Sequence, residues 1–417
     1  MIKNTKNKFL FFVLIFILLG TSIITSVKGL ESFSGYVRDR LGNPISGVSV
    51  ILTDSQAGFI GSATTNANGY YSMGVSLSGY SPYYLTAGKT GLQPYTFTVT
   101  DGGQYDFSLY TYVQGYVRNS LNEPMANVPV RVYNNGLFLA TSYSQTNGYY
   151  HLLLDCFPAN GQIKIEKHGY KDISLSITGG GTYDLYLRAI WAIIVGISEY
   201  QYISNLEFCD EDATDWYNKL HPMGYECRVY GDSSSNYPRY DGLATESNVR
   251  DAIQSLPAIT GPGDTVCFIT AGHGSVDWLD HQYLSMYNCR TYLNIGRYLD
   301  TEIADDFDDF DTGVNLFFFF DNCHSGGILD ELETISNVAD IYCAATCTAE
   351  GYGFDDDDYC NGLWTYYFLE FSWINHYGGS ASYSMETIFN DASNNYTHSG
   401  INAPQDYDGN PETSFYL

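Results

Sequence analysis

The stretch Val314–Gly327, which reads VNLFFFFDNCHSGG, decides the fold of the C-terminal half of this chain. Its apolar run from Leu316 to Phe320 is unbroken and stops abruptly at Asp321. A run this short and this apolar is typical of a central strand of a parallel sheet, which is covered on both faces. The polar residues after the run are therefore expected at the carboxyl end of the strand, where open α/β sheets place their chemistry.

A second apolar run, residues 265–270, also ends in a short polar motif, AGHGS at 271–275. If the two runs form neighbouring parallel strands, His273 and Cys323 lie at the same edge of the sheet. A thiol nucleophile needs such a neighbour, because an imidazole can stabilise the thiolate and protonate the leaving amine. The sequence therefore predicts a catalytic dyad of His273 and Cys323.

The motifs around these two residues resemble those of the caspase-like clan of cysteine peptidases, in particular its metacaspase-type members. His273 lies in Gly-His-Gly, Cys323 lies in Asp-x-Cys-His-Ser-Gly-Gly, and the two are 50 residues apart, close to the spacing of about 50 in caspases. The resemblance covers the chain from about Trp191 to the C-terminus. It implies that the backbone N–H groups of Gly274 and Cys323 form the oxyanion hole.

Two aspartates match the positions that line the substrate pocket of metacaspase-type enzymes. Asp321 lies two residues before Cys323, and Asp212 lies in the segment CDEDA at 209–213. Two carboxylates in one pocket favour the cationic side chain of Arg or Lys. The resemblance thus implies cleavage after Arg or Lys. The alternative is that Asp212 only caps its helix.

The sequence departs from the family pattern at two places, and two rival functions stay open. Residues 344–350 read AATCTAE where the family has a Ser/Ala/Asp-rich string, and Asn322 replaces a small residue or Cys. One rival is legumain-like cleavage after Asn. The other is an inactive caspase-like scaffold for extracellular binding, because a fold alone does not prove activity. His324 is expected to be structural, since adjacent residues in extended chain point in opposite directions.

An acidic segment after the His strand resembles the loop through which some metacaspases bind calcium. Carboxylates bunched on a loop suit Ca²⁺, and we expect calcium as an activator at most, with no cofactor required for the chemistry itself. The segment has no EF-hand spacing, and the exposed face of a helix is the alternative interpretation. The residues concerned are Asp300, Glu302, Asp305 and Asp306.

The first 29 residues predict an exported protein. Three lysines, at positions 3, 6 and 8, precede an apolar stretch from Phe9 to Leu19, and small residues follow before Leu30. This is the pattern of a signal peptide over residues 1–29. An uncleaved membrane anchor is the alternative, because further apolar residues lengthen the stretch. Either interpretation predicts an extracellular or cell-surface protein.

Negative charge is concentrated in the C-terminal part of the chain. The formal net charge is −28; residues 190–417 hold 6 Lys and Arg against 37 Asp and Glu, whereas residues 1–189 hold 13 against 10. Such a surface repels nucleic acid and attracts cations and basic peptides. We therefore expect protein or peptide substrates and no nucleic-acid partner.

The nine cysteines are an odd number, which leaves at least one thiol unpaired even in an oxidising compartment. Cys267 lies inside an apolar strand and is expected to be a buried thiol. The disulfide candidates are Cys343, Cys347 and Cys360, which lie near one another in the sequence. A zinc site is the rival interpretation, although no nearby His or Cys pair has a standard ligand spacing.

Two copies of one domain precede the catalytic region. GYVR at 35–38 returns at 115–118, and NGYY at 68–71 returns at 147–150. Short alternating runs separated by turn signals indicate antiparallel β-sandwiches, predicted over 30–110 and 111–188. Their motifs resemble carboxypeptidase regulatory-like, transthyretin-like domains, which usually serve as spacers or adhesion modules. The resemblance implies cell-surface or matrix components as partners.

Residues 189–417 alternate apolar strands with amphipathic helices, which predicts an α/β domain with a mostly parallel sheet. Taken together, the sequence predicts a multidomain chain: two β-sandwiches followed by a caspase-like α/β domain. The predicted activity is that of a secreted or surface-held cysteine endopeptidase, which forms an acyl-enzyme and then hydrolyses it.

Overall fold

The computed structural model describes residues 29–233 and 235–417, so the predicted signal peptide lies almost entirely outside the described residues. The chain forms two compact units. The first consists of the described residues up to Tyr112 together with Leu153–Phe157, and the second holds the rest. Neither described stretch contains a helix that is both long and apolar enough to span a membrane.

The first unit is a β-sandwich in which most strands bury alternate residues, as the period-two pattern predicts. In β4 (Tyr70–Ser76), for example, Tyr71, Met73 and Val75 point into the core. The first sheet contains β1 (Leu30–Asp39), β4, β7 (Gly103–Gln104) and β8 (Phe107–Leu109). The second has the order β3 (Phe59–Thr64), β2 (Ser49–Thr53), β5 (Tyr83–Gly88) and β6 (Tyr95–Val99).

The second sandwich has the same fold as the first, and the two share an equivalent tyrosine hydrogen bond. The Tyr71 hydroxyl donates to the Tyr105 carbonyl, and the Tyr150 hydroxyl donates to the Tyr183 carbonyl in the equivalent place. These two tyrosines end the NGYY motifs, so the repeat seen in the sequence is a repeat of structure. One sheet contains β9 (Thr111–Arg118), β12 (Tyr149–Leu154), β15 (Gly181–Thr182) and β16 (Leu185–Tyr186); the other contains β10 (Pro129–Asn134), β11 (Leu137–Tyr143), β13 (Gly161–Ile165) and β14 (Ile173–Ile177).

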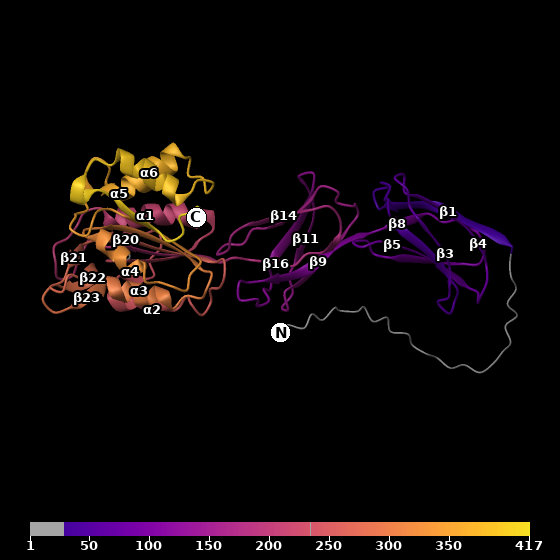
Figure 1. The fold of residues 1–417 in the computed structure, drawn as a ribbon, viewed down its shortest axis with the longest axis horizontal. Helices are drawn as coiled ribbons and strands as arrows, with labels where there is room; N and C mark the ends of the chain where they lie inside the picture. The colour runs from indigo at the N-terminus through magenta and orange to yellow at the C-terminus, as the bar shows by residue number, and fades with distance from the viewer. Residues whose placement is uncertain (1–28, 234) are drawn as a thin grey trace, which may run out of the picture. The chain divides into compact units, whose positions relative to one another are not determined.

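The C-terminal domain is built on a seven-stranded sheet, as the alternating strand and helix pattern predicts. All its strand pairs are parallel except the last. Helices cover both faces (Figure 1): α1, α5 and α6 lie on one side, and α2, α3 and α4 lie on the other. The strand order is β19 (Gly242–Leu243), β18 (Glu226–Gly231), β17 (Ile190–Gly196), β20 (Thr265–Gly272), β24 (Asn315–Asn322), β25 (Asp340–Ala345) and β28 (Gln405–Asp408).

The helices follow the expected signals in part. Thr245 caps α2 by accepting a hydrogen bond from the Asn248 N–H, as its place before an amphipathic run predicts. The sequence did not reveal a long π-helix, η3, or the separate antiparallel sheet made by β21, β22 and β23. The bounds are α1 (Cys209–Leu220), α2 (Glu246–Gln254), α3 (Asp300–Asp308), α4 (Ile328–Leu332), α5 (Leu363–Thr365), η3 (Tyr366–His376), α6 (Met385–Asn395), β21 (Gly274–Val276), β22 (Gln282–Arg290) and β23 (Ile295–Leu299).

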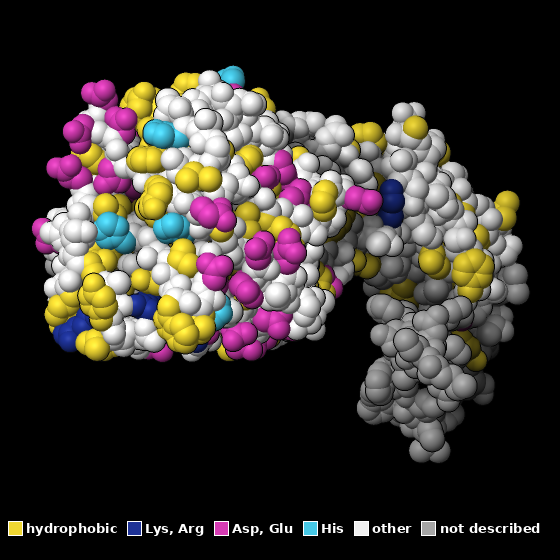
Figure 2. Space-filling view, turned by 60° about the vertical axis from the view of Figure 1, so that its left-hand side comes forward, with side chains coloured by type: hydrophobic (Ala, Val, Ile, Leu, Met, Phe, Trp, Pro, Cys, Tyr) yellow, Lys and Arg dark blue, Asp and Glu magenta, His cyan; other side chains and the backbone are white. Residues whose placement is uncertain are grey.

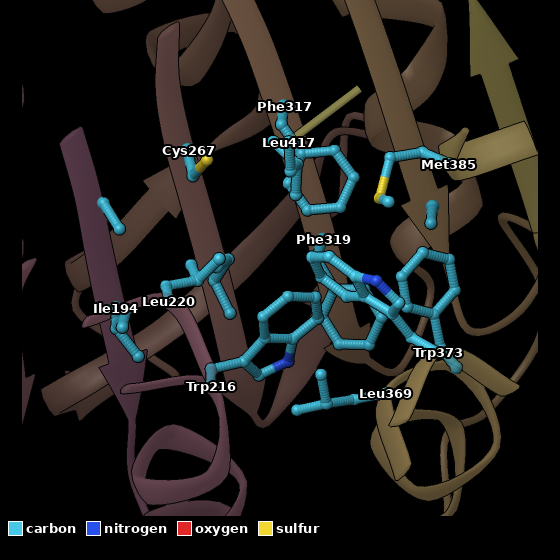
Figure 3. Close-up of a cluster of buried hydrophobic side chains, with 14 of the residues drawn as sticks. Ile194, Trp216, Leu220, Cys267, Phe317, Phe319, Leu369, Trp373, Met385 and Leu417 are labelled. Atoms are coloured by element: carbon cyan, nitrogen blue, oxygen red, sulfur yellow. The ribbon is translucent and has the colours of Figure 1, made fainter. Parts of the chain in front are cut away.

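Strand β24 is the central strand that its apolar run predicts. Phe317 and Phe319 enter the core under α1 and η3, whereas Leu316, Phe318 and Phe320 enter the core under α2, α3 and α4. The Phe319 ring lies against Trp216, with ring centroids 4.7 Å apart, and against Phe368 at 5.2 Å. Figure 3 shows Trp216, Phe319 and Trp373 packed in this first core. Aromatic burial of this kind supplies much of the stability of a domain.

The disulfide prediction was wrong. All nine cysteines are free thiols in the structure. Cys343 lies inside β25 and points into the core, Cys347 is buried in the loop after that strand, and Cys360 is exposed. Their closeness in sequence therefore does not bring their side chains together. The prediction of a buried thiol at Cys267 is confirmed, since Cys267 is fully buried in β20.

We expect Phe319→Ala to destabilise the C-terminal domain by about 3–5 kcal/mol, because it leaves a cavity beneath Trp216. All five tryptophans of the chain lie between Trp191 and Trp373, so tryptophan fluorescence in urea reports the unfolding of this domain alone. Tyr292→Ala is the matched control, since Tyr292 is 98% exposed; it should change the free energy of unfolding by less than about 0.5 kcal/mol. Equal effects of the two substitutions would contradict this description of the core.

Candidate functional site

The pairing of β20 with β24 brings the predicted dyad residues to one edge of the sheet. The two strands are parallel, and their register sets Gly272 beside Asn322. His273 and Cys323 are the next residues of their strands, so both follow the last paired position. The structure thus brings together the two residues that the sequence predicted as neighbours.

Asn322 ties the two strand ends together. Its Nδ2 donates to the Gly272 carbonyl at 2.9 Å, and its Oδ1 accepts a hydrogen bond from the Thr270 hydroxyl at 2.5 Å. The side chain is buried, and a buried amide with both ends satisfied rigidifies its surroundings. Asn322, which departs from the family pattern, therefore holds the ends of β20 and β24 together beneath the site.

The imidazole of His273 is oriented by residues that the sequence analysis missed. Its Nε2 lies 3.0 Å from the Ser204 carbonyl oxygen, and its backbone N–H donates to the Tyr200 hydroxyl at 2.7 Å. Because a carbonyl oxygen only accepts, Nε2 carries the hydrogen in this contact, which leaves Nδ1 as the basic nitrogen. Burial lowers the pKa of His273, and the Ser204 hydrogen bond offsets this only in part. The free imidazole is therefore neutral near pH 7.

The Cys323 thiol is partly buried and uncharged in the free protein. Burial raises its pKa, while backbone hydrogen bonds, including those of Cys323 itself and Gly274, lower it in part. These two groups are the predicted oxyanion donors. A Cβ at position 274 would collide with the carbonyl oxygen of Cys323, so only glycine fits there. Within the described residues, the Cys323 sulfur contacts the Gly353 carbonyl at 3.9 Å and makes no hydrogen bond with His273.

His324 has a structural position, in agreement with the expectation. Its backbone is left-handed, with φ of 62°. Its Nδ1 lies 2.8 Å from the Ala349 carbonyl, and its N–H donates to the Gly351 carbonyl at 2.9 Å. These contacts attach the loop after β25 to the residue beside the nucleophile.

Asp212 and Asp321 lie together at the end of β24, on either side of Gly362. Asp212 Oδ1 accepts a hydrogen bond from the Gly362 N–H at 2.9 Å, and Asp321 Oδ2 accepts from the Thr365 N–H at 2.8 Å. A Cβ on Gly362 would lie 2.6 Å from Asp212 Oδ2 and 2.5 Å from Asp321 Oδ2, so both carboxylates require a glycine there. Asp212 does not cap α1: the cap position is Phe208, which makes no side-chain cap hydrogen bond, and the Asp212 carboxyl accepts from Gly362 instead.

The two carboxyls are deeply buried, with exposed fractions of 1% for Asp212 and 7% for Asp321. Burial, followed by the nearby charge of Asp321, holds the pKa of Asp212 well above its ordinary value. Burial also raises the pKa of Asp321 to about 7. Asp212 Oδ2 has no hydrogen-bond partner among the described residues. A buried carboxylate oxygen without a partner is costly and suits a cation from outside.

Segment 353–362 encloses this pair of carboxyls. The Gly353 carbonyl contacts the Cys323 sulfur, the Gly362 N–H donates to Asp212, and Asp355 accepts a hydrogen bond from the Glu207 N–H at 3.1 Å. Asp355 is also close enough to raise the pKa values of His273 and Asp212. The sequence analysis missed this contribution, because only the fold brings the loop to the site.

The acidic residues expected to bind calcium do not fit a calcium site. Glu302 and Asp306 lie on α3 and both bind the guanidinium of Arg250, at 2.7 and 2.8 Å. Asp306 also accepts from the Tyr298 hydroxyl, Asp300 accepts from two backbone N–H groups, and Asp305 is exposed on the helix. An internal cation thus already pairs with two of these four carboxylates. In residues 29–233 and 235–417, no group of three or more His, Cys, Asp or Glu side chains is arranged to hold a metal ion.

The surface of the C-terminal domain is acidic, as the charge distribution predicts. Figure 2 shows Asp and Glu side chains over much of the visible face of this domain, with few Lys or Arg. The field of such a surface raises the local concentration of cationic ligands.

Two parts of the chain match known families. Residues 32–110 match the model of the carboxypeptidase regulatory-like domain, and residues 191–332 match that of the metacaspase, peptidase C14 domain. Both resemblances drawn from the motifs are therefore confirmed. The peptidase match supports a cysteine-type peptidase, which is a hydrolase.

One curated relative and two solved structures extend the comparison. The chain is 26% identical over 171 residues to Metacaspase-1 of Schizosaccharomyces pombe, an alignment that covers 38% of this chain and 40% of that protein. A Geobacter sulfurreducens protein of known structure is 17% identical with a TM-score of 0.41, covering 52% of this chain and 93% of that one. The Bacillus anthracis TIE protein is 12% identical with a TM-score of 0.22, covering 43% and 38%.

We expect Asp212→Asn to stabilise the C-terminal domain at pH 8 by about 1–2 kcal/mol, because it removes one of two buried like charges. A folded-state pKa raised to about 7 for Asp321 means that the folded protein keeps a proton that the unfolded chain loses near pH 4. The contribution of Asp212 and Asp321 to the free energy of unfolding is therefore fully present below about pH 4 and is lost as the pH rises through 7.

Urea unfolding at pH 5 and pH 8 tests this expectation. The increase in the free energy of unfolding caused by Asp212→Asn should be larger at pH 8 than at pH 5. Asp305→Asn, which changes an exposed carboxylate on α3, is the control and should be neutral at both pH values. If Asp212→Asn lowered the free energy of unfolding at pH 8, the negative charge of Asp212 would not be destabilising the folded domain.

Proposed function

We propose that this chain, whose residues 191–332 match a metacaspase-type cysteine peptidase domain, is an exported endopeptidase that cleaves peptide bonds after Arg or Lys. The observation that carries the proposal is the pair of buried carboxyls, Asp212 and Asp321, next to the Cys323 nucleophile. Among the described residues, Asp212 Oδ2 has no hydrogen-bond partner, and no Lys, Arg or His forms an ion pair with either carboxyl.

The proposed chemistry uses Cys323 and His273. The thiol transfers its proton to Nδ1 of His273 as the sulfur attacks the carbonyl carbon of the scissile bond. The resulting imidazolium then protonates the leaving amine, and water hydrolyses the thioester of the acyl-enzyme with His273 as the base. The N–H groups of Gly274 and Cys323 stabilise the negative oxygen of each tetrahedral intermediate. The Ser204 carbonyl keeps the imidazole in the required tautomer, as a positioning group.

The residue before the scissile bond would place its side chain between Asp212 and Asp321. A guanidinium offers several N–H donors in a fixed plane and can satisfy the free carboxylate oxygens of both residues. The neutral amide of Asn would leave at least one buried charge unpaired, so cleavage after Asn is the weaker alternative. The acidic surface favours substrates that are themselves basic.

The two sandwiches carry no paired nucleophile and base, so we assign them a spacer or adhesion role. They would hold the peptidase domain near cell-surface or matrix components outside the cell. The N-terminal signal, cleaved or retained as an anchor, supports this location.

We expect His273→Asn and Cys323→Ala to lower kcat/KM by at least about 10³-fold, because each removes a member of the dyad. His324→Asn is the matched control. Asn tolerates the left-handed backbone of that position, so kcat/KM should stay within about tenfold of the wild-type value. Hydrolysis of a fluorogenic Arg peptide measures all three. If His324→Asn alone abolished cleavage, the assignment of the base would be wrong.

The substrate preference is tested with fluorogenic peptides that end in Arg, Lys, citrulline, Asn or Asp. Arg and Lys peptides should be cut, and citrulline, which has the shape of Arg without the charge, should be cut at least about 100-fold more slowly. For the Arg peptide, kcat/KM should rise with pH through about 7 as the Asp321 carboxyl loses its proton. Cleavage of Asn alone would remove the pocket assignment, and no cleavage of any peptide would favour the inactive scaffold.

A further inference from the structure

One wall of the proposed substrate pocket is a short hairpin that brings a third acidic residue beside the two buried carboxyls. Strands β26 (Asp355–Asp356) and β27 (Asn361–Gly362) form this hairpin, and their ladder pairs the first residue of β26 with the last residue of β27. That last residue is the glycine that donates its N–H to Asp212 and leaves no room for a Cβ beside Asp321. Asp355 is therefore one strand spacing, about 5 Å, from the backbone that separates the two carboxyls.

The Asp355 side chain points toward the loop before α1. Its Oδ2 accepts the Glu207 N–H at 3.1 Å, and Glu207 lies two residues before the first residue of α1. The same loop carries Ser204, whose carbonyl oxygen lies 3.0 Å from His273 Nε2. The Asp355 carboxylate is thus held where the loop that orients the base meets the helix that carries Asp212.

Asp355 differs from Asp212 and Asp321 in its exposure. It is exposed to solvent, whereas the other two are buried, which places it at the mouth of the pocket. Among the described residues, no Lys, Arg or His forms an ion pair with it. Burial is the main cause of the raised pKa values of Asp212 and Asp321, and the charge of Asp355 adds to both.

The two kinds of cationic side chain differ in what they offer at the mouth of such a pocket. A guanidinium carries N–H donors on its two terminal nitrogens and also on Nε, which is nearer the substrate backbone. The terminal donors can reach Asp321 and the buried Asp212 Oδ2, which has no hydrogen-bond partner within the described residues. A lysine has a methylene group in place of Nε, because all its donors are on the terminal nitrogen. An acceptor at the mouth therefore distinguishes Arg from Lys.

We propose that Asp355 is a further specificity-determining residue, whose carboxylate accepts the Nε–H of a substrate arginine and makes the enzyme prefer Arg to Lys before the scissile bond. This inference rests on the proposed function and deepens it. Asp212 and Asp321 bind the charged end of either side chain, and Asp355 adds a charge-assisted hydrogen bond for Arg alone. The Glu207 N–H occupies only one of the acceptor positions of the Asp355 carboxylate, so the others are available to the substrate.

The kinetics of the full chain on fluorogenic peptides ending in Arg or Lys test the proposal. The wild type should favour Arg over Lys by at least about tenfold in kcat/KM. Asp355→Asn should lower kcat/KM by about tenfold or more for the Arg peptide, and by less than about threefold for the Lys peptide, which loses only a distant charge.

Asp358→Asn is the matched control. It removes the same charge from the turn of the same hairpin, where Asp358 is exposed and donates its backbone N–H to Asp356. It should leave the ratio of Arg to Lys cleavage as it is in the wild type. An equal fall of this ratio in Asp358→Asn and Asp355→Asn would show that the general field of the hairpin acts, and would overturn the assignment to Asp355.

A purely structural role for Asp355 predicts a different pattern. Asn at position 355 keeps an oxygen that can accept the Glu207 N–H, so the loop that orients His273 stays in place. A structural role therefore predicts that Asp355→Asn behaves as the wild type, and that Asp355→Ala lowers cleavage after Arg and after Lys alike. Either result would overturn the proposal.

Failure of this inference and failure of the proposed function give different results. Equal cleavage after Arg and Lys by the wild type would leave the peptidase assignment standing and remove the role of Asp355. If the wild type cuts no peptide, the proposed function fails. Calorimetry of Cys323→Ala with the amides of acetyl-Arg and acetyl-Lys then examines the pocket alone. Tighter binding of the Arg amide that is lost on adding Asp355→Asn supports the role of Asp355, and equal binding of the two amides overturns it.

Discussion

The parallel pairing of β20 with β24 is the constraint on which the rest of the site depends. Its register sets Gly272 opposite Asn322, so a histidine and a cysteine that are 50 residues apart in sequence become neighbours. A slip by one residue would move one of them by about 3.3 Å and turn its side chain to the other face of the sheet. The Asn322 amide opposes such a slip, because its two ends hydrogen bond to Gly272 and Thr270 on the adjacent strand.

The hydrophobic core also forces the burial of the pocket carboxylates. Asp212 and Trp216 are four residues apart on α1 and therefore lie on the same face of the helix. Trp216 packs against Phe319, and this contact holds that face of α1 against the sheet. Asp212 is thereby buried at the end of β24 beside Asp321. The aromatic packing offsets the cost of two buried carboxyls, and in the proposed function a bound cationic side chain relieves that cost.

The sequence was sufficient for features that depend on local pattern. The apolar runs before Cys323 and His273 predicted the sheet and the neighbouring dyad residues, and the repeated NGYY motifs predicted the two sandwiches. Both predictions were possible because the period of a strand and its ends depend on consecutive residues. Ser204 and Gly362 could not be found in this way. They lie on loops whose approach to the site depends on tertiary folding, and no periodic signal marks them.

Two failures have specific physical causes. Asp300, Glu302 and Asp306 have a spacing that suits either a calcium loop or the first turns of a helix, and only the fold brings Arg250 from α2 to pair with the last two. The disulfide candidates were chosen by their closeness in sequence. However, the run Ile341–Ala345 lies inside β25, and a strand interior directs Cys343 into the core, away from the loop that carries Cys360.

The charges of the pocket and the nucleophile are coupled, and this gives the proposed specificity a chemical consequence. The charge of Asp321 is one of the factors that raise the pKa of the Cys323 thiol, after burial. A cationic side chain bound between Asp212 and Asp321 neutralises that charge and therefore removes this contribution. It also excludes water from the site, which strengthens the hydrogen bonds from Gly274 and Cys323 to the developing oxyanion. In the proposed mechanism, the thiol is thus uncharged in the free enzyme and becomes easier to ionise only when a basic residue fills the pocket.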